Sequence, residues 1–220
     1  PPGFQRAHAA APPGAWSDDG AQALCLLASL LQCGHLDIDD FSRRLLKWYE
    51  HGYMAVDYVV FDVGVQTSVA LSALKSGVAV ERAAPATELH NGNGSLMRVL
   101  PLALWHTGSD EQLIVDAARQ SIPTHAHVRS QVCCALYCMW ARAVLSGFPD
   151  SWRRACDIVR AFSQTRHSWR DELDLHIVPD GPPCGRGSGY VVDCLHSARF
   201  ALEAAAYPPL VWTPAYVFSE

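Results

Sequence analysis

The stretch Trp16-Ser17-Asp18-Asp19-Gly20-Ala21-Gln22-Ala23-Leu24-Cys25-Leu26-Leu27-Ala28-Ser29-Leu30-Leu31 predicts a helix in the centre of the fold. Beyond its first turn this helix is apolar on nearly every side, which is typical of a helix buried in a core. Ser17 has the side chain of an N-cap, and carboxylates in a first turn stabilise the helix dipole by about 0.3–1 kcal/mol each. The same carboxylates, Asp18 and Asp19, would be held rigidly there, so they are also candidate metal ligands.

The composition is that of an ordinary globular protein. The chain has 220 residues, of which 50% are hydrophobic and 18% charged, and this length fits one domain. Because the net charge is −5 and no run of Lys or Arg occurs, nucleic acid is not an expected partner. The longest apolar run, Ala23 to Leu31, is far shorter than the roughly 20 residues that span a bilayer, so no membrane segment is predicted.

The cysteines predict a reducing compartment. There are eight, most of them lie within helical patterns, and no Cys-x-x-Cys pair occurs. This usage favours buried thiols in a cytoplasmic protein over disulfides or a zinc site. Residues 1–15 are rich in Pro, Ala and Gly without periodicity, and are predicted to be a linker or the cut edge of a longer protein.

Caps and periodic apolar residues predict further helices after the first. They fall at residues 41–51, 68–76, 99–105, 110–121, 128–143, 151–162 and 190–206, the last with Leu195, Ala198 and Leu202 facing inward. Residues 53–61 and 163–176 lack a clear helical period and are predicted to be irregular. With no hairpin signal and no internal repeat, the sequence predicts an all-α fold, a single-domain orthogonal helical bundle over residues 16–207 with an irregular tail at 208–220.

Two glycine-rich segments are candidate ligand loops. Asn91-Gly92-Asn93-Gly94-Ser95 directly precedes a predicted helix, so its backbone could approach a diphosphate closely. Alternating Asn and Gly is also typical of a simple turn. The second segment, residues 181–189, leads into Tyr190, which is either a platform for a base or sugar or a plug over the core.

Two shorter motifs carry polar side chains. His125 and His127 lie at i and i+2 before the longest predicted helix, on different faces, so they would not chelate one ion. His125 is interpreted as a hydrogen-bonding group for a ligand or for the preceding loop. Asp62, in Phe61-Asp62-Val63-Gly64, is by itself typical of a turn.

Together these stretches resemble the ADP-ribosylglycohydrolase family, hydrolases that remove ADP-ribose from modified side chains and related conjugates. The resemblance runs from about Pro12 to Tyr207 and implies an all-α fold with a binuclear magnesium or manganese site. Its motifs, in order, are Trp16–Asp19, Phe61–Gly64 with Thr67, Asn91–Arg98 with Pro101, Thr124–His127, and Gly187–Asp193.

The resemblance also implies roles for individual residues. Asp18, Asp19 and Asp62 become the candidate catalytic residues, with Asp62 orienting the leaving group or the opened ribose. Metal-bound water would attack the anomeric carbon. The implied metal ligands are Ser17, Asp18 and Asp19, and the implied substrate-binding residues are Asn91, Gly92, Asn93, Gly94, Ser95, Thr124, His125 and Tyr190.

The sequence departs from the family pattern in its metal ligands. No Asp-x-Asp-Thr/Ser element follows the last predicted helix, and Asp37-Ile38-Asp39 is better explained as a helix cap. Gly20 also stands where the family usually has Thr. Since two carboxylates cannot balance two divalent cations, at most one weakly bound Mg²⁺ or Mn²⁺ is expected.

Three hypotheses about function follow. The chain is either a metal-dependent hydrolase, as a piece of a longer enzyme shortened at both ends, or a catalytically inactive pseudoenzyme that binds ADP-ribose. A helical domain whose loops only hold the core together is the third. In the first two cases the expected partner is ADP-ribose or an ADP-ribosylated protein.

Overall fold

The computed structural model describes residues 8–205, in which all regular structure is helical apart from one isolated bridge. η1 is a 3₁₀ turn and η2 a π-helical turn. The predicted all-α fold is therefore confirmed, while the predicted tail at residues 208–220 lies outside the described residues. The elements are α1 (Asp18–Cys33), α2 (Ile38–His51), η1 (Val56–Tyr58), α3 (Val65–Lys75), α4 (Val80–Ala83), α5 (Leu100–Trp105), α6 (Asp110–Arg119), α7 (Val128–Leu145), α8 (Ser151–Ser163), α9 (His167–Asp171), η2 (Glu172–Ile177) and α10 (Val191–Ala205).

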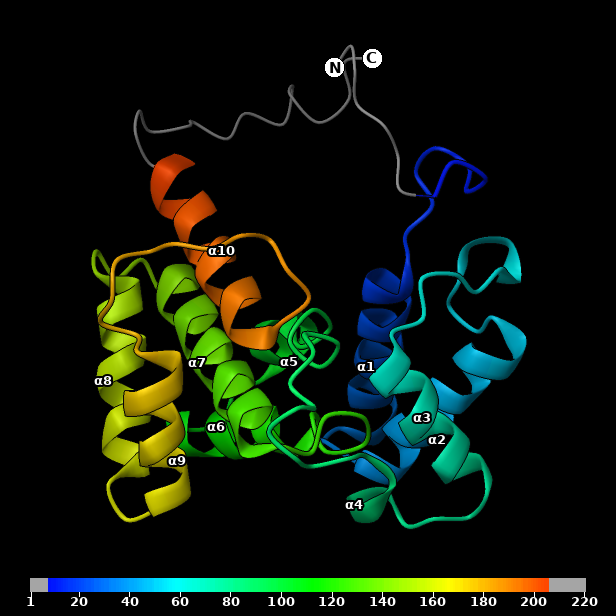
Figure 1. Cartoon of the computed structure of the whole chain (residues 1–220), viewed down its shortest axis with the longest axis horizontal. Helices are drawn as coiled ribbons and strands as arrows, with labels where there is room; N and C mark the ends of the chain where they lie inside the picture. Colours follow the sequence, from blue (N-terminus) through cyan, green and yellow to red (C-terminus); the bar gives the residue numbers. More distant parts are fainter. Residues whose placement is uncertain (1–7, 206–220) are drawn as a thin grey trace.

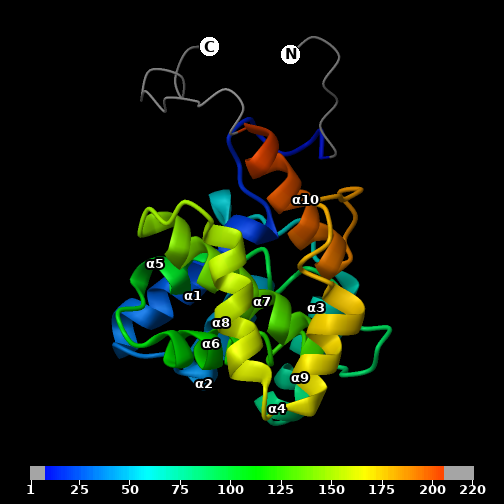
Figure 2. The same ribbon diagram turned by 90° about the vertical axis from the view of Figure 1, so that its left-hand side faces the viewer.

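The helices form two groups joined through α5. Figure 1 shows α1 to α4 on one side and α7 to α10 on the other. The short helix α5 contacts both α1 and α7. The view of Figure 2 shows α10 above the rest of the bundle, with its last turns pointing away from it. In residues 8–205 no helix is both long and apolar enough to cross a membrane.

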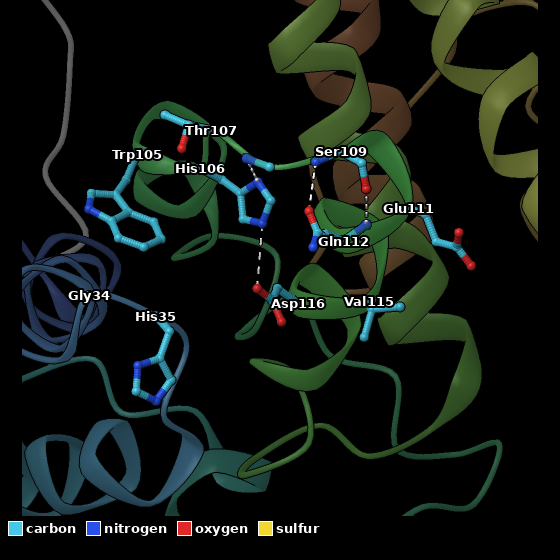
Figure 3. A pocket seen from close by; sticks show the side chains of 11 residues that line it. Gly34, His35, Trp105, His106, Thr107, Ser109, Glu111, Gln112, Val115 and Asp116 are labelled. Carbon is cyan, nitrogen blue, oxygen red and sulfur yellow. Dashed lines mark hydrogen bonds and ion pairs between the residues drawn. The ribbon is translucent and has the colours of Figure 1, made fainter.

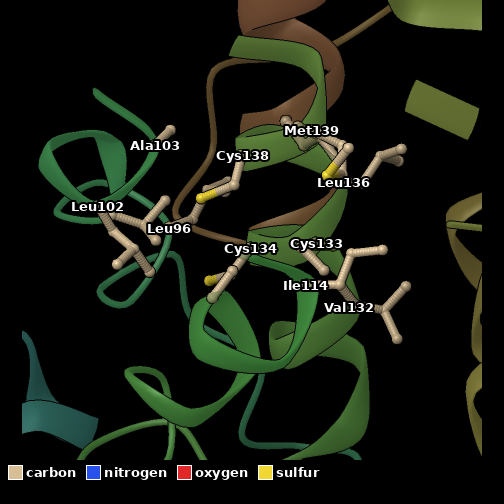
Figure 4. Packing of buried hydrophobic residues seen from close by; sticks show 14 of the residues in the cluster. Leu96, Leu102, Ala103, Ile114, Val132, Cys133, Cys134, Leu136, Cys138 and Met139 are labelled. Atoms are coloured by element: carbon tan, nitrogen blue, oxygen red, sulfur yellow. The ribbon is translucent and has the colours of Figure 1, made fainter. Parts of the chain in front are cut away.

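The central helix is α7 rather than α1. It contacts α5, α6, α8, α9, α10 and η2, whereas α1 packs mainly against α2 and α5 and leaves Leu31 exposed. Thiols and aliphatic side chains of α7 pack together with Leu96, Leu102 and Ile114 (Figure 4). All eight cysteines are free thiols; five are buried as predicted, whereas Cys33 and Cys194 are half-buried and Cys184 is exposed. Burial raises the pKa of the Cys134 thiol to about 11, so this thiol is protonated at neutral pH.

Local capping signals are largely confirmed. Asp37 accepts hydrogen bonds from the backbone N–H groups of Asp39 and Asp40, which explains the Asp-x-Asp sequence as a cap. A capping box joins Ser109 and Gln112 at the start of α6. The prediction for Ser17 is wrong in one respect: it occupies the N-cap position of α1, but its side chain makes no cap hydrogen bond.

The structure corrects two further predictions. Residues 163–176, predicted to be irregular, contain α9 and most of η2, whose Leu173 and Ile177 are buried. Contacts with α7 and α8 stabilise this segment in place of a clear helical period. Leu195 is buried as predicted, but Ala198 and Leu202, also predicted to face inward, are exposed. Leu202 is 49% exposed, near the end of α10 that projects beyond the bundle (Figure 1).

Candidate functional site

Gln66, on the first turn of α3, brings three of the sequence motifs to one place. Its amide nitrogen Nε2 donates to the carbonyl oxygens of His90 (3.1 Å) and Thr124 (3.2 Å). Its oxygen Oε1 accepts from the backbone N–H of Gly92 (3.3 Å). The segments around residues 62–67, 90–95 and 124–125 therefore meet at this side chain. Sequence reasoning missed Gln66, because nothing but its position next to Thr67 sets it apart.

The two predicted ligand loops lie side by side. Gly92 and Tyr190 form an isolated antiparallel bridge, and the N–H of Asn93 donates to the carbonyl of Gly189 at 2.9 Å. The backbone N–H groups of Gly92 and Asn93 are thus already used within the protein. A diphosphate at this loop would have to be bound by other groups.

Asn91 and Ser95 lie at the buried ends of the first loop. The Asn91 side chain accepts from the Ser130 hydroxyl at 3.1 Å and donates to the carbonyl of Glu88 at 2.9 Å. The Ser95 hydroxyl accepts from the Ser121 hydroxyl at 2.8 Å. In this structure both side chains therefore hold the loop in shape.

His125 is a neutral, buried ring that packs against the glycines of the loop. Its Nδ1 is 2.8 Å from the Thr124 hydroxyl. A β-carbon built on Gly94 would lie 2.6 Å from Cε1 of His125, and one on Gly92 would lie 3.3 Å from Nε2. Burial, together with the positive charge of Arg98, lowers the pKa of His125 to about 3. The sequence predicted that these glycines let a ligand approach the backbone closely. In the structure the imidazole of His125 takes up that space.

Arg98 is a fully buried cation beneath the site. Its guanidinium donates to the side chain of Gln22 (2.9 Å) and to both the side chain (3.2 Å) and the carbonyl (2.9 Å) of Gln120. Among residues 8–205 no carboxylate forms an ion pair with it. Burial lowers the pKa of Arg98 to about 10, whereas the negative charge of Asp18 is one of the influences that raise it. The side chain remains protonated at neutral pH.

Asp18 and Asp19 open α1, and the charge of Asp62 acts on Asp18. Asp18 is only 7% exposed, and burial and the negative charges of Asp19 and Asp62 raise the pKa of its carboxyl to about 7. The Ser17 hydroxyl donates to Asp19 at 2.7 Å. Asp62, more than 40 residues along the chain, is thus brought to the two acids with which the sequence analysis associated it.

The backbone of Asp62 is strained. Its φ is +59°, a left-handed conformation that is uncommon outside glycine. Nε2 of His8 lies 3.1 Å from Oδ2 of Asp62. Non-glycine residues in this region cost about 1–3 kcal/mol and cluster at functional sites.

The donor chemistry suits a hard divalent cation, but the number of donors is too small for two ions. Carboxylate and hydroxyl oxygens are the ligands that Mg²⁺ and Mn²⁺ prefer. A cation would also offset the burial and the negative charges of Asp19 and Asp62, which together raise the pKa of Asp18. Within the described part of the chain, however, no three His, Cys, Asp or Glu side chains are arranged to hold a metal ion. These residues by themselves do not form a two-ion centre.

The order and arrangement of these motifs agree with a comparison to known families, in which residues 1–213 match the ADP-ribosylglycohydrolase family. The chain belongs to this family. It is 29% identical over 203 residues to "ADP-ribosylarginine hydrolase Tri1" of Serratia proteamaculans (strain 568), covering 86% of this chain and 50% of the relative. Tri1 of Pseudomonas putida (strain GB-1) is likewise 29% identical over 200 residues, with the same coverage.

A solved structure supports the family fold. The "ADP-ribosylglycohydrolase-related protein complex" superposes with a TM-score of 0.62 at 29% identity, covering 87% of this chain and 60% of that one. The chain spans about half the length of the curated relatives it matches. The predicted family and fold are therefore confirmed, and the roles of individual residues stay predictions.

Gly20, where the resemblance implies Thr, has no room for a side chain while Trp16 keeps its position. A β-carbon at this position would lie 2.7–2.8 Å from atoms of the Trp16 side chain. The Trp16 indole in turn donates to the carbonyl of Met54 at 2.8 Å. Glycine therefore allows the Trp16 side chain to fold back over the first turn of α1.

A separate cavity of about 570 Å³ lies away from all the predicted site residues (Figure 3). It is lined by the end of α1, the α5–α6 connection and one face of α6. Nδ1 of His106 accepts from the N–H of Gly108 (3.2 Å) and lies 3.0 Å from Arg142, while its Nε2 lies 3.5 Å from Asp116. Because both ring nitrogens of His106 have partners within the protein, His106 is not available as a base. None of the predicted site residues lines this cavity.

Proposed function

We propose that this chain recognises ADP-ribosylated arginine side chains of proteins and takes part in removing the ADP-ribose. Family membership and the two hydrolases named for ADP-ribosylarginine support the substrate class. The observation that carries the proposal is the junction at Gln66, which joins the loop of Gly92 to Thr124. Asp62, four residues before Gln66, lies near enough to Asp18 to raise the pKa of that carboxyl.

In this proposal, different side chains recognise different parts of ADP-ribose. The neutral imidazole of His125 borders the ribose pocket from behind the glycines of the loop, and it adds no charge there. Tyr190, 40% exposed on the neighbouring loop, packs on the adenine. Asn91 and Ser95 keep the loop in its bound shape through their buried hydrogen bonds.

Asp18 and Asp19 would contribute to binding Mg²⁺ or Mn²⁺, a cation that polarises substrate oxygens and activates water when bound. Asp62, whose charge acts on Asp18, would orient the departing group. Because the described residues do not form a two-ion centre, hydrolysis requires further acidic ligands. The same observation favours a second candidate function, in which the chain binds ADP-ribose without cleaving it.

Calorimetric titration of ADP-ribose into the full chain, with and without excess Mg²⁺ or Mn²⁺, tests the proposal. For the hydrolase, we expect metal to strengthen binding, Asp18→Ala to abolish this effect, and ADP-ribose to be released from an ADP-ribosylated arginine peptide. Binding that is independent of both metal and Asp18, without release, would favour the binding protein. No binding at millimolar ADP-ribose would refute both functions.

A further inference from the structure

We infer that Arg129, held by Glu172 of the π-helical turn η2, is a positioning residue that fixes the side chain of Tyr190 at the rim of the ADP-ribose site. The inference rests on the function proposed above, because it takes Tyr190 to be a ligand platform. It assigns a role to an ion pair that none of the sequence motifs includes.

The backbone of Tyr190 is held firmly while its side chain is open to solvent. Main-chain hydrogen bonds join the flanking residues to the first loop, from Asn93 to Gly189 and from Val191 to Asn91, both at 2.9 Å. The side chain itself is 40% exposed. A half-exposed aromatic ring of this kind needs a contact at its far end to hold one rotamer.

Arg129 supplies that contact. Its Nη1 donates to the Tyr190 hydroxyl at 3.2 Å, and its Nε donates to Oε2 of Glu172 at 2.6 Å. Arg129 is 7% exposed and Glu172 is 9% exposed, so the ion pair is largely shielded from water. Breaking a buried pair of this kind is strongly destabilising, because it leaves an uncompensated charge.

The third nitrogen of the Arg129 guanidinium makes no comparable contact in the part of the chain that the structure describes. Nη2 of Arg129 is buried and has no hydrogen-bond partner among the described residues. The contacts that orient the guanidinium within the described residues are therefore those of Nε with Glu172 and of Nη1 with Tyr190.

The π-helical turn places Glu172 where this pair can form. Glu172 is the first residue of η2, directly after α9, and η2 packs against α7, whose first turn carries Arg129. Single π-helical turns are rare and often occur at functional sites. His127, the N-cap of α7, is also near the Glu172 carboxylate, with its Nε2 3.9 Å from Oε1 of Glu172. Arg129 thus links the π-helical turn η2 to Tyr190 at the end of the second loop.

Pre-organising an aromatic side chain lowers the entropy lost when a ligand binds against it. Loss of the Arg129–Tyr190 contact is expected to weaken ADP-ribose binding about 3- to 10-fold. An ion pair that only holds η2 on α7 would instead change thermal stability and leave affinity unaffected.

A double-mutant cycle on the full chain separates these roles. Tyr190→Phe removes only the hydroxyl and leaves the ion pair intact, and Arg129→Lys keeps the charge but loses the planar fork of donors. We expect each to weaken ADP-ribose binding by calorimetry and the double variant to bind no more weakly than the weaker single variant. Arg142→Lys, an arginine near the other end of α7 that pairs with Asp110, is the matched control and should bind as wild type does.

The outcomes distinguish this inference from the proposed function. Additive losses, or unchanged affinity in Tyr190→Phe or Arg129→Lys, would overturn the positioning role while leaving ADP-ribose recognition intact. A lowered melting temperature of Arg129→Lys with wild-type affinity would assign the ion pair to stability alone. If wild-type protein does not bind ADP-ribose, both the proposed function and the inference are wrong.

Discussion

Replacing Asp18 by Asn should stabilise the metal-free protein at alkaline pH. The folded state raises the pKa of this carboxyl from 3.8 to about 7, mainly through burial and then through Asp19 and Asp62. Between these values the folded protein binds a proton that the unfolded chain has released. The free energy of unfolding of the wild type therefore falls as the pH rises towards 7, and stays lower above it.

The size of the effect follows from the shift. Each pKa unit corresponds to about 1.36 kcal/mol, so ionising Asp18 between about pH 5 and pH 8 costs the folded state up to roughly 3 kcal/mol. An Asn side chain at position 18 does not ionise, so it avoids this cost, and it has nearly the same shape as Asp. The stability of Asp18→Asn relative to wild type should therefore rise by up to about 3 kcal/mol between the two pH values.

Urea unfolding of wild type and variant at both pH values, in the presence of EDTA, measures this difference. The comparison with wild type cancels contributions such as that of His125, whose lowered pKa acts with the opposite sign. Asp39→Asn makes the same substitution on the first turn of α2 and controls for a lost negative charge at a helix start. If the stability difference between Asp18→Asn and wild type is the same at both pH values to within about 0.5 kcal/mol, the carboxyl is not held in a repulsive, buried setting and the reasoning fails.

Three further substitutions test the surroundings of the site. Gly94→Ala should lower the free energy of unfolding by about 1–3 kcal/mol in urea, because the new methyl group would lie 2.6 Å from Cε1 of His125, whereas Gly189→Ala, with open space around it, should have little effect. Gln66→Leu leaves three backbone groups without their partner and should cost at least about 1–3 kcal/mol and weaken ADP-ribose binding by calorimetry; wild-type stability would contradict the junction. Arg98→Met removes a positive charge that lowers the pKa of His125, so an NMR titration should give a higher pKa for this ring, and an unchanged value would contradict the electrostatic coupling.

The parts of the fold that the sequence predicted are those with local signals. The cap of α2 at Asp37 and the capping box of α6 at Ser109 each depend on residues within a few positions of one another. The family motifs added the grouping of Asp62 with Asp18, which no spacing along the chain could indicate. Helix periodicity and caps act locally, so one sequence is enough to read them.

The missed parts depend on contacts between distant segments. The segment of α9 and η2 is polar and weakly periodic, and the charge of Glu172 is buried only because Arg129 lies opposite on α7. Gln66 bridges three loops with a side chain that has no motif of its own. Both residues are ordinary polar side chains in the sequence, and only their partners in space give them a role.

The junction at Gln66 makes the framework of the site indifferent to ionic strength and acidity. Its hydrogen bonds come from an uncharged amide that neither titrates nor attracts counterions, unlike a surface ion pair. The loop of Gly92 and the turn at Thr124 should therefore stay joined from mildly acidic to alkaline buffers and in concentrated salt. A response of ligand affinity to these conditions would then originate at the charged groups around the site, the aspartates near the start of α1 or the Arg129–Glu172 pair, and not at the Gln66 junction.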